Sequence, residues 1–226
     1  MREIKALRLL ENWEHFDGHG PVQLCEIVTL SNGSNHAQWR GMKASSEPPF
    51  VCSPNSSVVI DGIVYVFSYR PECIASFDLQ AEEWRQPLRG PLSSLWDDDP
   101  QAWRGKFRLY ELSLAALSGH LVVVYPTRAS TDLWFLMDFE KSLWVKQHSI
   151  PKTVLPAKYS LSTLFVCPLV VLEDGRIMLY YRTISDGLVG TYSPRTNTFT
   201  DMAEVENCVA VGLYTGSLMS LATHAT

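Results

Sequence analysis

Residues 58–67 read VVIDGIVYVF, in which the turn pair Asp61-Gly62 separates two runs of β-branched and aromatic residues. A polar residue, Asp78, follows, and an aromatic residue, Trp84, stands six positions later. The same order returns twice, as Gly119, Asp138 and Trp144 and then as Gly175, Ser193 and Phe199. The turn glycines at positions 62, 119 and 175 are therefore 57 and 56 residues apart. A repeat of this length with several short strands per unit predicts stacked or radial β-sheets.

Each full unit is expected to hold four short antiparallel strands. The expected ranges are 51–53 or 56–60, 63–68, 73–79 and 83–87, then 109–116, 121–125, 132–138 and 143–149, then 165–172, 176–181, 187–192 and 198–202. Residues 22–30 and 38–40 are expected to be strands of an incomplete unit before these. The sequence therefore predicts an all-β fold, a partial or small β-propeller of about four four-stranded blades. A two-sheet sandwich is the alternative.

The two ends of the chain depart from the repeat. Residues 1–20 are expected to form a short helix or an irregular segment, because Ile4, Leu7 and Leu10 are spaced along one helical face. Residues 21–226 are assigned to the propeller repeats. Residues 208–214 are expected to add a strand to the sheet of another unit, since an unpaired strand edge promotes aggregation.

Composition favours an intracellular globular protein. The formal net charge is -5 and the pI is about 5.7, whereas a nucleic-acid surface needs a basic patch. No apolar run is long enough to cross a bilayer, and the N-terminus lacks the apolar core of a signal peptide. The 5 cysteines are odd in number and widely spread, which fits reduced thiols. We expect a protein of the cytoplasm or nucleus that binds neither nucleic acid nor membrane.

Four short motifs follow one another along the chain. They are Gln38-Trp39-Arg40 after Leu30, Ile60-Asp61-Gly62-Ile63-Val64-Tyr65 with Phe77-Asp78-Leu79, Asp132-Leu133-Trp134-Phe135-Leu136 with Trp144-Val145-Lys146, and Leu172-Glu173-Asp174-Gly175 with Tyr192-Ser193-Pro194-Arg195. Their order and spacing over about residues 22–221 resemble the plant F-box-associated domains, which are kelch-like propellers. The resemblance implies that the propeller selects protein substrates for ubiquitination by an SCF-type E3 ligase. Members usually carry an F-box that binds a Skp1-type adaptor, but residues 1–20 show no recognisable F-box, so adaptor binding is not expected of this chain.

The aromatic residues that close the units are expected to be structural. Trp39, Trp84, Trp144 and Phe199 stand at equivalent places late in each unit. A large aromatic side chain at a repeated position favours packing between neighbouring blades over ligand binding.

The candidate partner-binding residues are arginines and tyrosines that follow the second strand of each full unit. They are Tyr69, Arg70, Arg128, Tyr181 and Arg182. If the units are radial, equivalent positions gather on one end of the propeller. Arginine and tyrosine are enriched at binding hot spots, and arginine clusters bind acidic or phosphorylated segments. The alternative is that these arginines are solvated or pair with carboxylates of neighbouring blades.

A second candidate partner-binding segment is the link between the first two full units. It places Trp96 and Trp103 on either side of the run Asp97-Asp98-Asp99. Exposed tryptophan is uncommon, and loops often carry function, so the two tryptophans are candidates for partner contact. The alternative is a packed excursion with the aspartates in water.

No catalytic or metal-binding pattern stands out. Consecutive carboxylates at 97–99 lack the alternating spacing of a calcium loop, and His15, His19 and Cys25 lack a fourth zinc ligand. No hydrolase, metalloprotease or phosphate-loop motif occurs. We therefore expect a protein-interaction module without cofactor or catalytic activity. A propeller enzyme and a carbohydrate-binding propeller, with Trp96 and Trp103 stacking on a sugar, are the alternatives.

Overall fold

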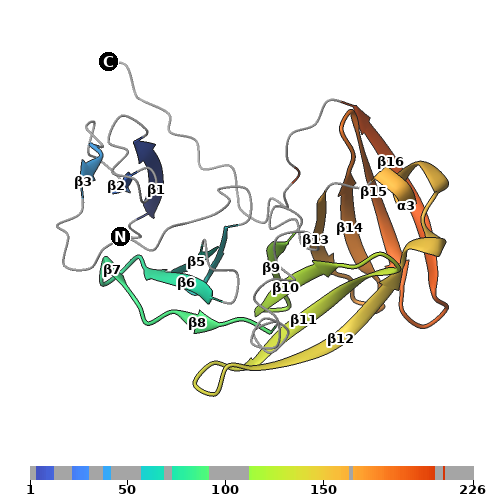
Figure 1. The fold of residues 1–226 in the computed structure, drawn as a ribbon, viewed down its shortest axis with the longest axis horizontal. Helices are drawn as coiled ribbons and strands as arrows, with labels where there is room; N and C mark the ends of the chain where they lie inside the picture. The colour runs from blue at the N-terminus through green and yellow to red at the C-terminus, as the bar shows by residue number, and fades with distance from the viewer. Residues whose placement is uncertain are drawn as a thin grey trace, which may run out of the picture.

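The predicted all-β class is confirmed by the computed structural model. It describes residues 4–12, 22–30, 38–41, 57–68, 73–91, 112–162, 165–206 and 211. These residues form four antiparallel sheets and one short helical link (Figure 1). The sheets follow one another along an arc, with the first sheet at one end and the fourth at the other. None of the described residues forms a helix of the length and apolarity needed to span a membrane.

Each sheet is built from consecutive strands. The first sheet holds β1 (Ile4–Asn12), β2 (Val22–Leu30) and β3 (Arg40–Gly41). The second holds β4 (Val58–Ile60), β5 (Ile63–Phe67), β6 (Cys73–Asp78), β7 (Glu83–Trp84) and β8 (Leu88–Arg89), of which β8 pairs with β6. The third holds β9 (Ser113–Leu117), β10 (His120–Pro126), β11 (Ser130–Asp138) and β12 (Leu143–Pro151). The fourth holds β13 (Phe165–Val171), β14 (Ile177–Arg182), β15 (Asp186–Ser193) and β16 (Thr198–Glu206).

The expected N-terminal helix is wrong for residues 4–12. These residues are strand β1, which pairs along its whole length with β2, from Ile4 opposite Leu30 to Asn12 opposite Val22. Leu7 and Leu9, two positions apart, pack against the core shared with the second sheet, as expected of alternate side chains on a strand. Packing of Leu7 and Leu9 against the second sheet favours the strand more than the weak helical spacing of the apolar residues favours a helix.

The turn glycines adopt the same backbone conformation in all three full units. The φ angles are 78° at Gly62, 76° at Gly119 and 81° at Gly175, in the left-handed region that glycine enters without steric cost. Asp61 and Ser118 also have positive φ, so the first two hairpins have two-residue type I′ turns. The third hairpin has a longer connection, with Gly175 N–H donating to Leu172 O at 2.9 Å. The repeat deduced from these glycines is therefore confirmed.

The polar residue before each closing aromatic stabilises the loop between the third and fourth strands. Asp78 Oδ1 accepts hydrogen bonds from the backbone N–H groups of Gln80 and Ala81 at 2.9 and 3.0 Å. Asp138 Oδ1 accepts one from Lys141 N–H at 3.0 Å. Side-chain oxygens of this kind replace the backbone partners that a tight turn leaves unpaired. This explains why a short polar residue returns at the same place in each unit.

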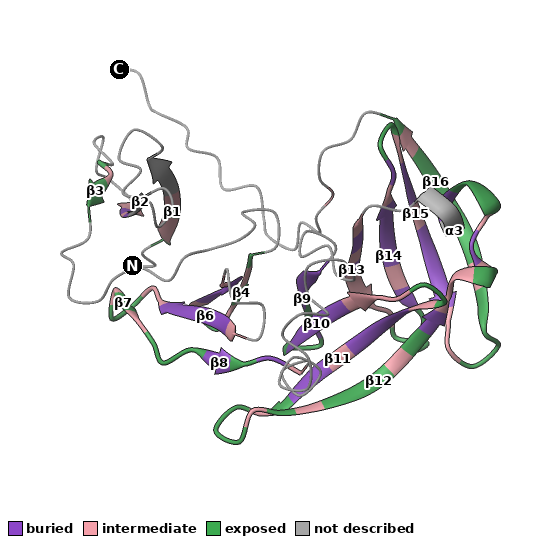
Figure 2. Cartoon of the chain, in the orientation of Figure 1, coloured by how far each residue is buried: buried purple, intermediate pink, exposed green. Residues whose placement is uncertain are grey.

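Neighbouring sheets pack face to face, as blades of a propeller do. The first and second sheets share a core that contains Ile27, Val64, Val66 and Phe77. The second and third share a core that contains Tyr65, Phe67, Leu121 and Val123. The third and fourth share one that contains Val122, Val124, Leu179 and Tyr181. Because side chains alternate along a strand, odd and even residues of β5 and of β10 contact opposite neighbours. Figure 2 shows these central strands buried and much of β12 and β16 exposed.

Three of the four closing aromatics lie between sheets, as predicted. Trp84 packs against the core of the first and second sheets, Trp144 against that of the second and third, and Phe199 against that of the third and fourth. Trp144 Nε1–H also donates to Arg89 O of the second sheet at 2.9 Å. Trp39 differs, because its ring lies under the guanidinium of Arg8 in the first sheet, with 4.4 Å from Cζ to the ring centroid.

A short link between the third and fourth sheets is not evident in the sequence. It contains the 3₁₀ turn η3 (Lys152–Val154) and the helix α3 (Ala157–Ser162). Leu155 and Tyr159 from this link are buried in the core between the third and fourth sheets. The expected terminal strand at 208–214 lies outside the described residues, apart from Val211.

Candidate functional site

The third and fourth sheets present two loops at the same end of the molecule. Ser113 Oγ, at the start of β9, donates a hydrogen bond to Val166 O, at the start of β13, at 2.8 Å. These two strands therefore begin side by side. Val124 of β10 pairs with Ser113, and Tyr181 of β14 pairs with Val166, so the antiparallel strands β10 and β14 both end there. The loops that follow β10 and β14 leave the sheets from this common end.

The two loops are matching four-residue turns. Thr127 N–H donates to Ser130 O at 2.7 Å, and Thr183 N–H donates to Asp186 O at 2.8 Å. Both threonine hydroxyls also bond to the fourth residue of the turn: Ser130 N–H reaches Thr127 Oγ1 at 2.9 Å, and Asp186 N–H reaches Thr183 Oγ1 at 3.1 Å. Threonine side chains support turns in this way. The turn backbones are thus held by their own hydrogen bonds, and the two middle residues project.

The helical link joins the two turns. Lys152 N–H donates to Ala129 O in the first turn at 2.8 Å. Lys158 Nζ forms an ion pair with Asp186 Oδ2 in the second turn at 3.0 Å. Tyr159 OH donates to Gly187 O, just beyond that turn, at 3.3 Å. The turns 127–130 and 183–186 and the link residues Lys152 and Lys158 therefore lie together, and we call them the two-turn surface.

The structure aligns Arg128 with Ile184 rather than with Arg182. Arg128 and Ile184 each follow the turn threonine, and both are exposed. Arg182 precedes Thr183; it is half-buried, and its Cζ lies 5.7 Å from the centroid of the Phe165 ring on the paired strand. Arg128 and Arg182 were matched by counting residues from Gly119 and Gly175. That count does not show which side chain projects, because a shift of one or two positions in a tight turn changes the projecting residue. Of the two described arginines, Arg128 alone occupies the projecting position.

Tyr181 is buried, which corrects its assignment as a partner-contacting residue. Its exposed fraction is 0%, and its ring lies edge-on to that of Phe199 at 5.6 Å between centroids. Burial raises the pKa of its hydroxyl above the ordinary value. The strand periodicity explains the error: Leu179 and Tyr181 alternate on the face of β14 that meets the third sheet.

Tyr181→Phe is expected to raise the free energy of unfolding by about 1 kcal/mol, because the Tyr181 hydroxyl is buried and has no hydrogen-bond partner among the described residues. The matched control is Tyr192→Phe, which removes a hydroxyl that donates to Asn197 Oδ1 at 3.0 Å and should destabilise the protein. Urea denaturation of both variants measures the effect. Equal destabilisation by the two changes would show that the Tyr181 hydroxyl has a partner after all.

The other predicted partner residues cannot be placed. Tyr69, Arg70, Trp96 and Trp103 lie outside the described residues. The sequence analysis missed Ile184, which is 89% exposed and thus the most exposed of the large hydrophobic side chains in the described part of the chain. The available signal was an apolar residue inside the turn-forming stretch Thr183-Ile184-Ser185-Asp186.

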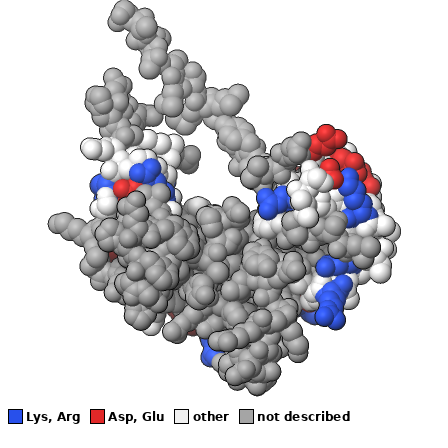
Figure 3. Space-filling model, turned by 45° about the horizontal axis from the view of Figure 1, so that its top comes forward, with Lys and Arg blue, Asp and Glu red and all other residues white. Residues whose placement is uncertain are grey.

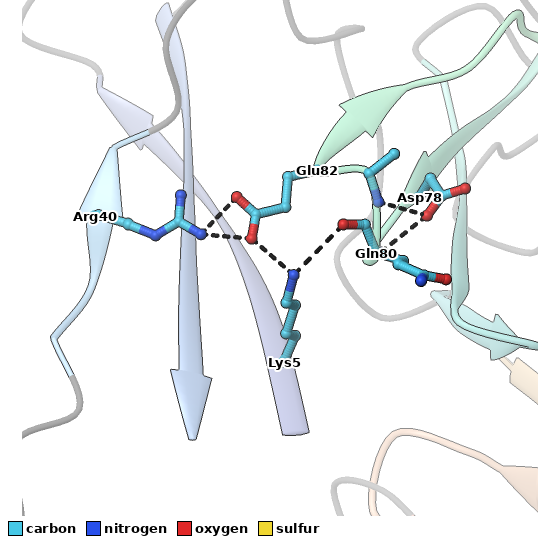
Figure 4. Close-up of polar contacts among 6 residues, drawn as sticks. Lys5, Arg40, Asp78, Gln80 and Glu82 are labelled. Atoms are coloured by element: carbon cyan, nitrogen blue, oxygen red, sulfur yellow. Dashed lines mark hydrogen bonds and ion pairs between the residues drawn. The ribbon is translucent and has the colours of Figure 1, made fainter. Parts of the chain in front are cut away.

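At the opposite end, a charged cluster joins the first two sheets. Glu82, in the loop between β6 and β7, accepts a hydrogen bond from Lys5 of β1 at 2.9 Å and from Arg40 of β3 at 2.5 Å (Figure 4). Lys5 Nζ also reaches Gln80 O at 3.5 Å. These contacts give the Trp39-Arg40 motif a structural role, since Arg40 holds the first sheet to the second.

Glu82→Gln is expected to lower the melting temperature at neutral pH and to have no effect in acid. Hydrogen bonds from Arg40 and Lys5 hold the pKa of Glu82 below its ordinary value. The stabilisation is therefore complete above the unfolded pKa of about 4.3 and is lost as the pH falls through the lower folded pKa. Thermal melts between neutral pH and strong acid test this. Glu83→Gln makes the same change at the exposed neighbouring residue and is the control; its melting temperature at neutral pH should stay close to that of the wild type.

Charged side chains lie at both ends of the sheets. The two-turn surface carries Arg128, Lys152, Lys158 and Asp186, and the end of β16 adds Glu206 opposite Asp186 and Glu204 beside Lys158, so acidic and basic side chains are mixed there. The turns at the opposite end carry Asp61, Asp78, Glu82, Glu83, Asp138, Glu140, Glu173 and Asp174 against Lys141, Arg176 and Arg195. On the side of the fourth sheet, Figure 3 shows Lys and Arg atoms beside a separate group of Asp and Glu atoms. Among the described residues, no group of three His, Cys, Asp or Glu is placed to hold a metal ion.

Comparison with known proteins defines the class. A family model described as "F-box associated beta propeller domain" matches residues 4–208, and this match includes β1. No curated protein sequence matches the chain. Two solved structures of the NanB sialidase, one of them from Streptococcus pneumoniae and the other described as NanB plus Optactamide, are 11% identical over 91% of this chain, with TM-scores of 0.41 and 0.42. The chain spans 35% of the length of those chains.

The four sheets, their face-to-face packing and the extent of the family match agree. This chain belongs to the family of F-box associated beta propeller domains. The resemblance seen in the motifs is thereby confirmed.

Proposed function

We propose that this propeller binds a protein partner, takes no part in catalysis, and selects that partner for ubiquitination when an F-box is supplied. Membership of the F-box associated family supports the protein-binding role. The observation that carries the proposal is the two-turn surface, where internally bonded turns hold Arg128 and Ile184 out into solvent. Because the turn backbones are already fixed by their own hydrogen bonds, binding a partner there costs little conformational entropy.

Affinity capture with the purified, tagged chain tests the protein-binding role. We expect at least one protein to be captured reproducibly from extract and to bind the chain again when purified. Depletion of the chain from cells should then raise the abundance of that partner if it is selected for degradation. Unchanged abundance despite direct binding would remove the ubiquitination role and leave the binding role.

A glycan array and a panel of glycosidase substrates test the two competing functions. We expect neither specific glycan binding nor turnover. Specific binding to a sugar, or hydrolysis by the purified chain, without any protein partner would contradict the proposal in favour of a carbohydrate-binding or enzymatic propeller.

A further inference from the structure

We infer that β12, the outer strand of the third sheet, pairs with an extended segment of a protein partner that carries apolar side chains at alternate positions. This edge is a second contact surface, and it does not depend on the two-turn surface. Three features support it: the open edge of β12, the apolar side chains beside that edge, and the pairing of the nearby charges with one another.

The edge of β12 is long and carries little charge. Within the described residues β12 pairs with β11 alone, so the backbone groups on its other side have no strand partner there. The last strands of the first and second sheets are two residues long, and β16 carries the exposed carboxylates of Asp201, Glu204 and Glu206. In contrast, β12 has nine residues, and Lys146 is its one lysine, arginine or carboxylate. Short strands and charges protect sheet edges from pairing, so β12 is the outer edge best suited to accept a further strand.

Exposed apolar side chains are concentrated beside this edge. Of the nine large apolar side chains that are exposed in the described part of the chain, four lie within residues 137–145. Leu143 and Val145 are 50% and 42% exposed. Val145 pairs with Phe135 of the core between the third and fourth sheets, so Leu143 and Val145 share the face of β12 that points toward the fourth sheet. The loop end of the hairpin lies away from that sheet (Figure 1), which leaves both side chains in water.

The length of the edge favours a flexible segment over a second copy of the chain. A bulge at Gln147, whose Nε2 donates to Met137 Sδ at 3.4 Å, limits the regularly paired part of the edge to residues 143–146. Four residues of a strand span about 14 Å. Two rigid copies meeting along so short an edge would bury much less than the roughly 1,200 Å² of a stable interface. An extended segment can instead pair with residues 143–146 and continue over Met137, which is 48% exposed.

The charged groups of this hairpin mostly pair with one another. Lys146 Nζ lies 3.3 Å from Asp132 Oδ2, and Lys141 Nζ lies 3.4 Å from Asp138 Oδ2. Glu140 adds one exposed carboxylate in the loop. The hairpin therefore selects neither a strongly acidic nor a strongly basic partner, and its exposed apolar side chains determine the preference.

The alternation of side chains defines the partner sequence. A strand paired with β12 places every second residue on the face of Leu143 and Val145. Apolar residues at those positions remove the exposed surface of both side chains from water, which favours binding. Two apolar residues separated by one residue of any type are therefore the expected core of the bound segment.

The test begins with selection of binders from a phage library of random twelve-residue peptides on the immobilised full chain. We expect the selected peptides to carry Val, Ile, Leu, Phe or Tyr at two positions separated by one residue. A fluorescein-labelled synthetic copy of the most enriched peptide is then titrated by fluorescence anisotropy. Single N-methyl groups along this peptide remove one backbone N–H at a time. Because an added strand uses every second N–H, affinity should fall by about fivefold at alternate residues and little at those between them.

Substitutions in the chain locate the contact. Leu143→Asp and Val145→Asp should each weaken the peptide by about tenfold or more, as expected for hot-spot residues. The matched controls are Met202→Asp, at an exposed apolar position on β16, and Ile184→Asp, on the two-turn surface. Both should leave the affinity within about twofold of the wild-type value, well below a hot-spot effect. Circular dichroism and thermal melts of all four variants establish that they fold.

Three results would overturn the inference. The first is an affinity that shows no alternation on N-methylation, and the second is an affinity that is insensitive to both Leu143→Asp and Val145→Asp. The third is self-association of the chain in light scattering that Val145→Asp abolishes, because the edge would then belong to a second copy. If Ile184→Asp alone weakens the peptide, the contact lies on the two-turn surface. If no peptide is selected while captured proteins still bind, the inference fails and the function proposed above stands.

Discussion

Phe77→Ala is expected to lower the free energy of unfolding by about 3–5 kcal/mol, as for other buried aromatic residues. Phe77 is 0% exposed and lies edge-on to Trp84, with 5.1 Å between ring centroids. It belongs to the core that the second sheet shares with Ile27 of the first sheet. The change leaves a cavity at the interface with the first sheet, and the Trp84 ring loses its edge-on contact.

Urea denaturation and hydrogen exchange measure this effect and its location. Because each sheet contacts mainly its neighbours, the loss of amide protection should be larger in β1 and β2 than in β13–β16. Phe139→Ala is the matched control: its ring is 41% exposed, and the change should cost about 1 kcal/mol or less. An equal loss of protection in all four sheets would contradict nearest-neighbour packing along the arc.

Asp132→Ala is expected to cost about 2–3 kcal/mol, the range for a buried hydrogen-bonded charge. The side chain of Asp132 is 10% exposed. It accepts hydrogen bonds from Ser130 Oγ at 2.8 Å and from Ser149 Oγ at 2.7 Å, and it pairs with Lys146 Nζ at 3.3 Å. Without the carboxylate, the hydroxyls of Ser130 and Ser149 lose their hydrogen-bond acceptor. Ser130 keeps its contact with Thr127 but loses the one with Asp132.

The loss at Asp132 should also reach the two-turn surface. Ser130 ends the turn that presents Arg128, so losing the carboxylate should speed amide hydrogen exchange in residues 127–130 in addition to lowering stability. Lys146→Met is the control, since the lysine is 45% exposed and its ion pair contributes about 1 kcal/mol or less. Urea denaturation and hydrogen exchange measure these two effects. Unchanged exchange in residues 127–130 of a destabilised Asp132→Ala variant would show that Asp132 does not hold the turn.

Much of the fold could be predicted because its determinants are local. The Asp61-Gly62 pair needs positive φ at two adjacent residues, and few residue types other than glycine, asparagine and aspartate supply it. Asp78 bonds within its own loop, and Trp84 packs at the interface between the first and second sheets, so both positions could also be recognised from the sequence. The N-terminal strand was not predicted because the apolar residues in 4–12 show only a weak periodicity. Pairing with β2 fixes this segment as a strand.

The candidate site was harder to predict. Arg128 was identified from its place after a strand, but Tyr181 was assigned to the surface and Ile184 was overlooked. Both errors concern which way a side chain points at the end of β14. That direction depends on the strand face that meets the third sheet and on the position of Thr183 in the turn.

The repeat, the strand pairs of the three full units and the left-handed turns follow from the amino-acid sequence, because each depends on backbone preferences within a few residues. The packing of one sheet on another makes Arg128 and Ile184 equivalent, joins their turns through Lys152 and Lys158, and encloses Tyr181. These features arise where residues far apart in the sequence meet, and their neighbours are set by how one sheet packs on the next.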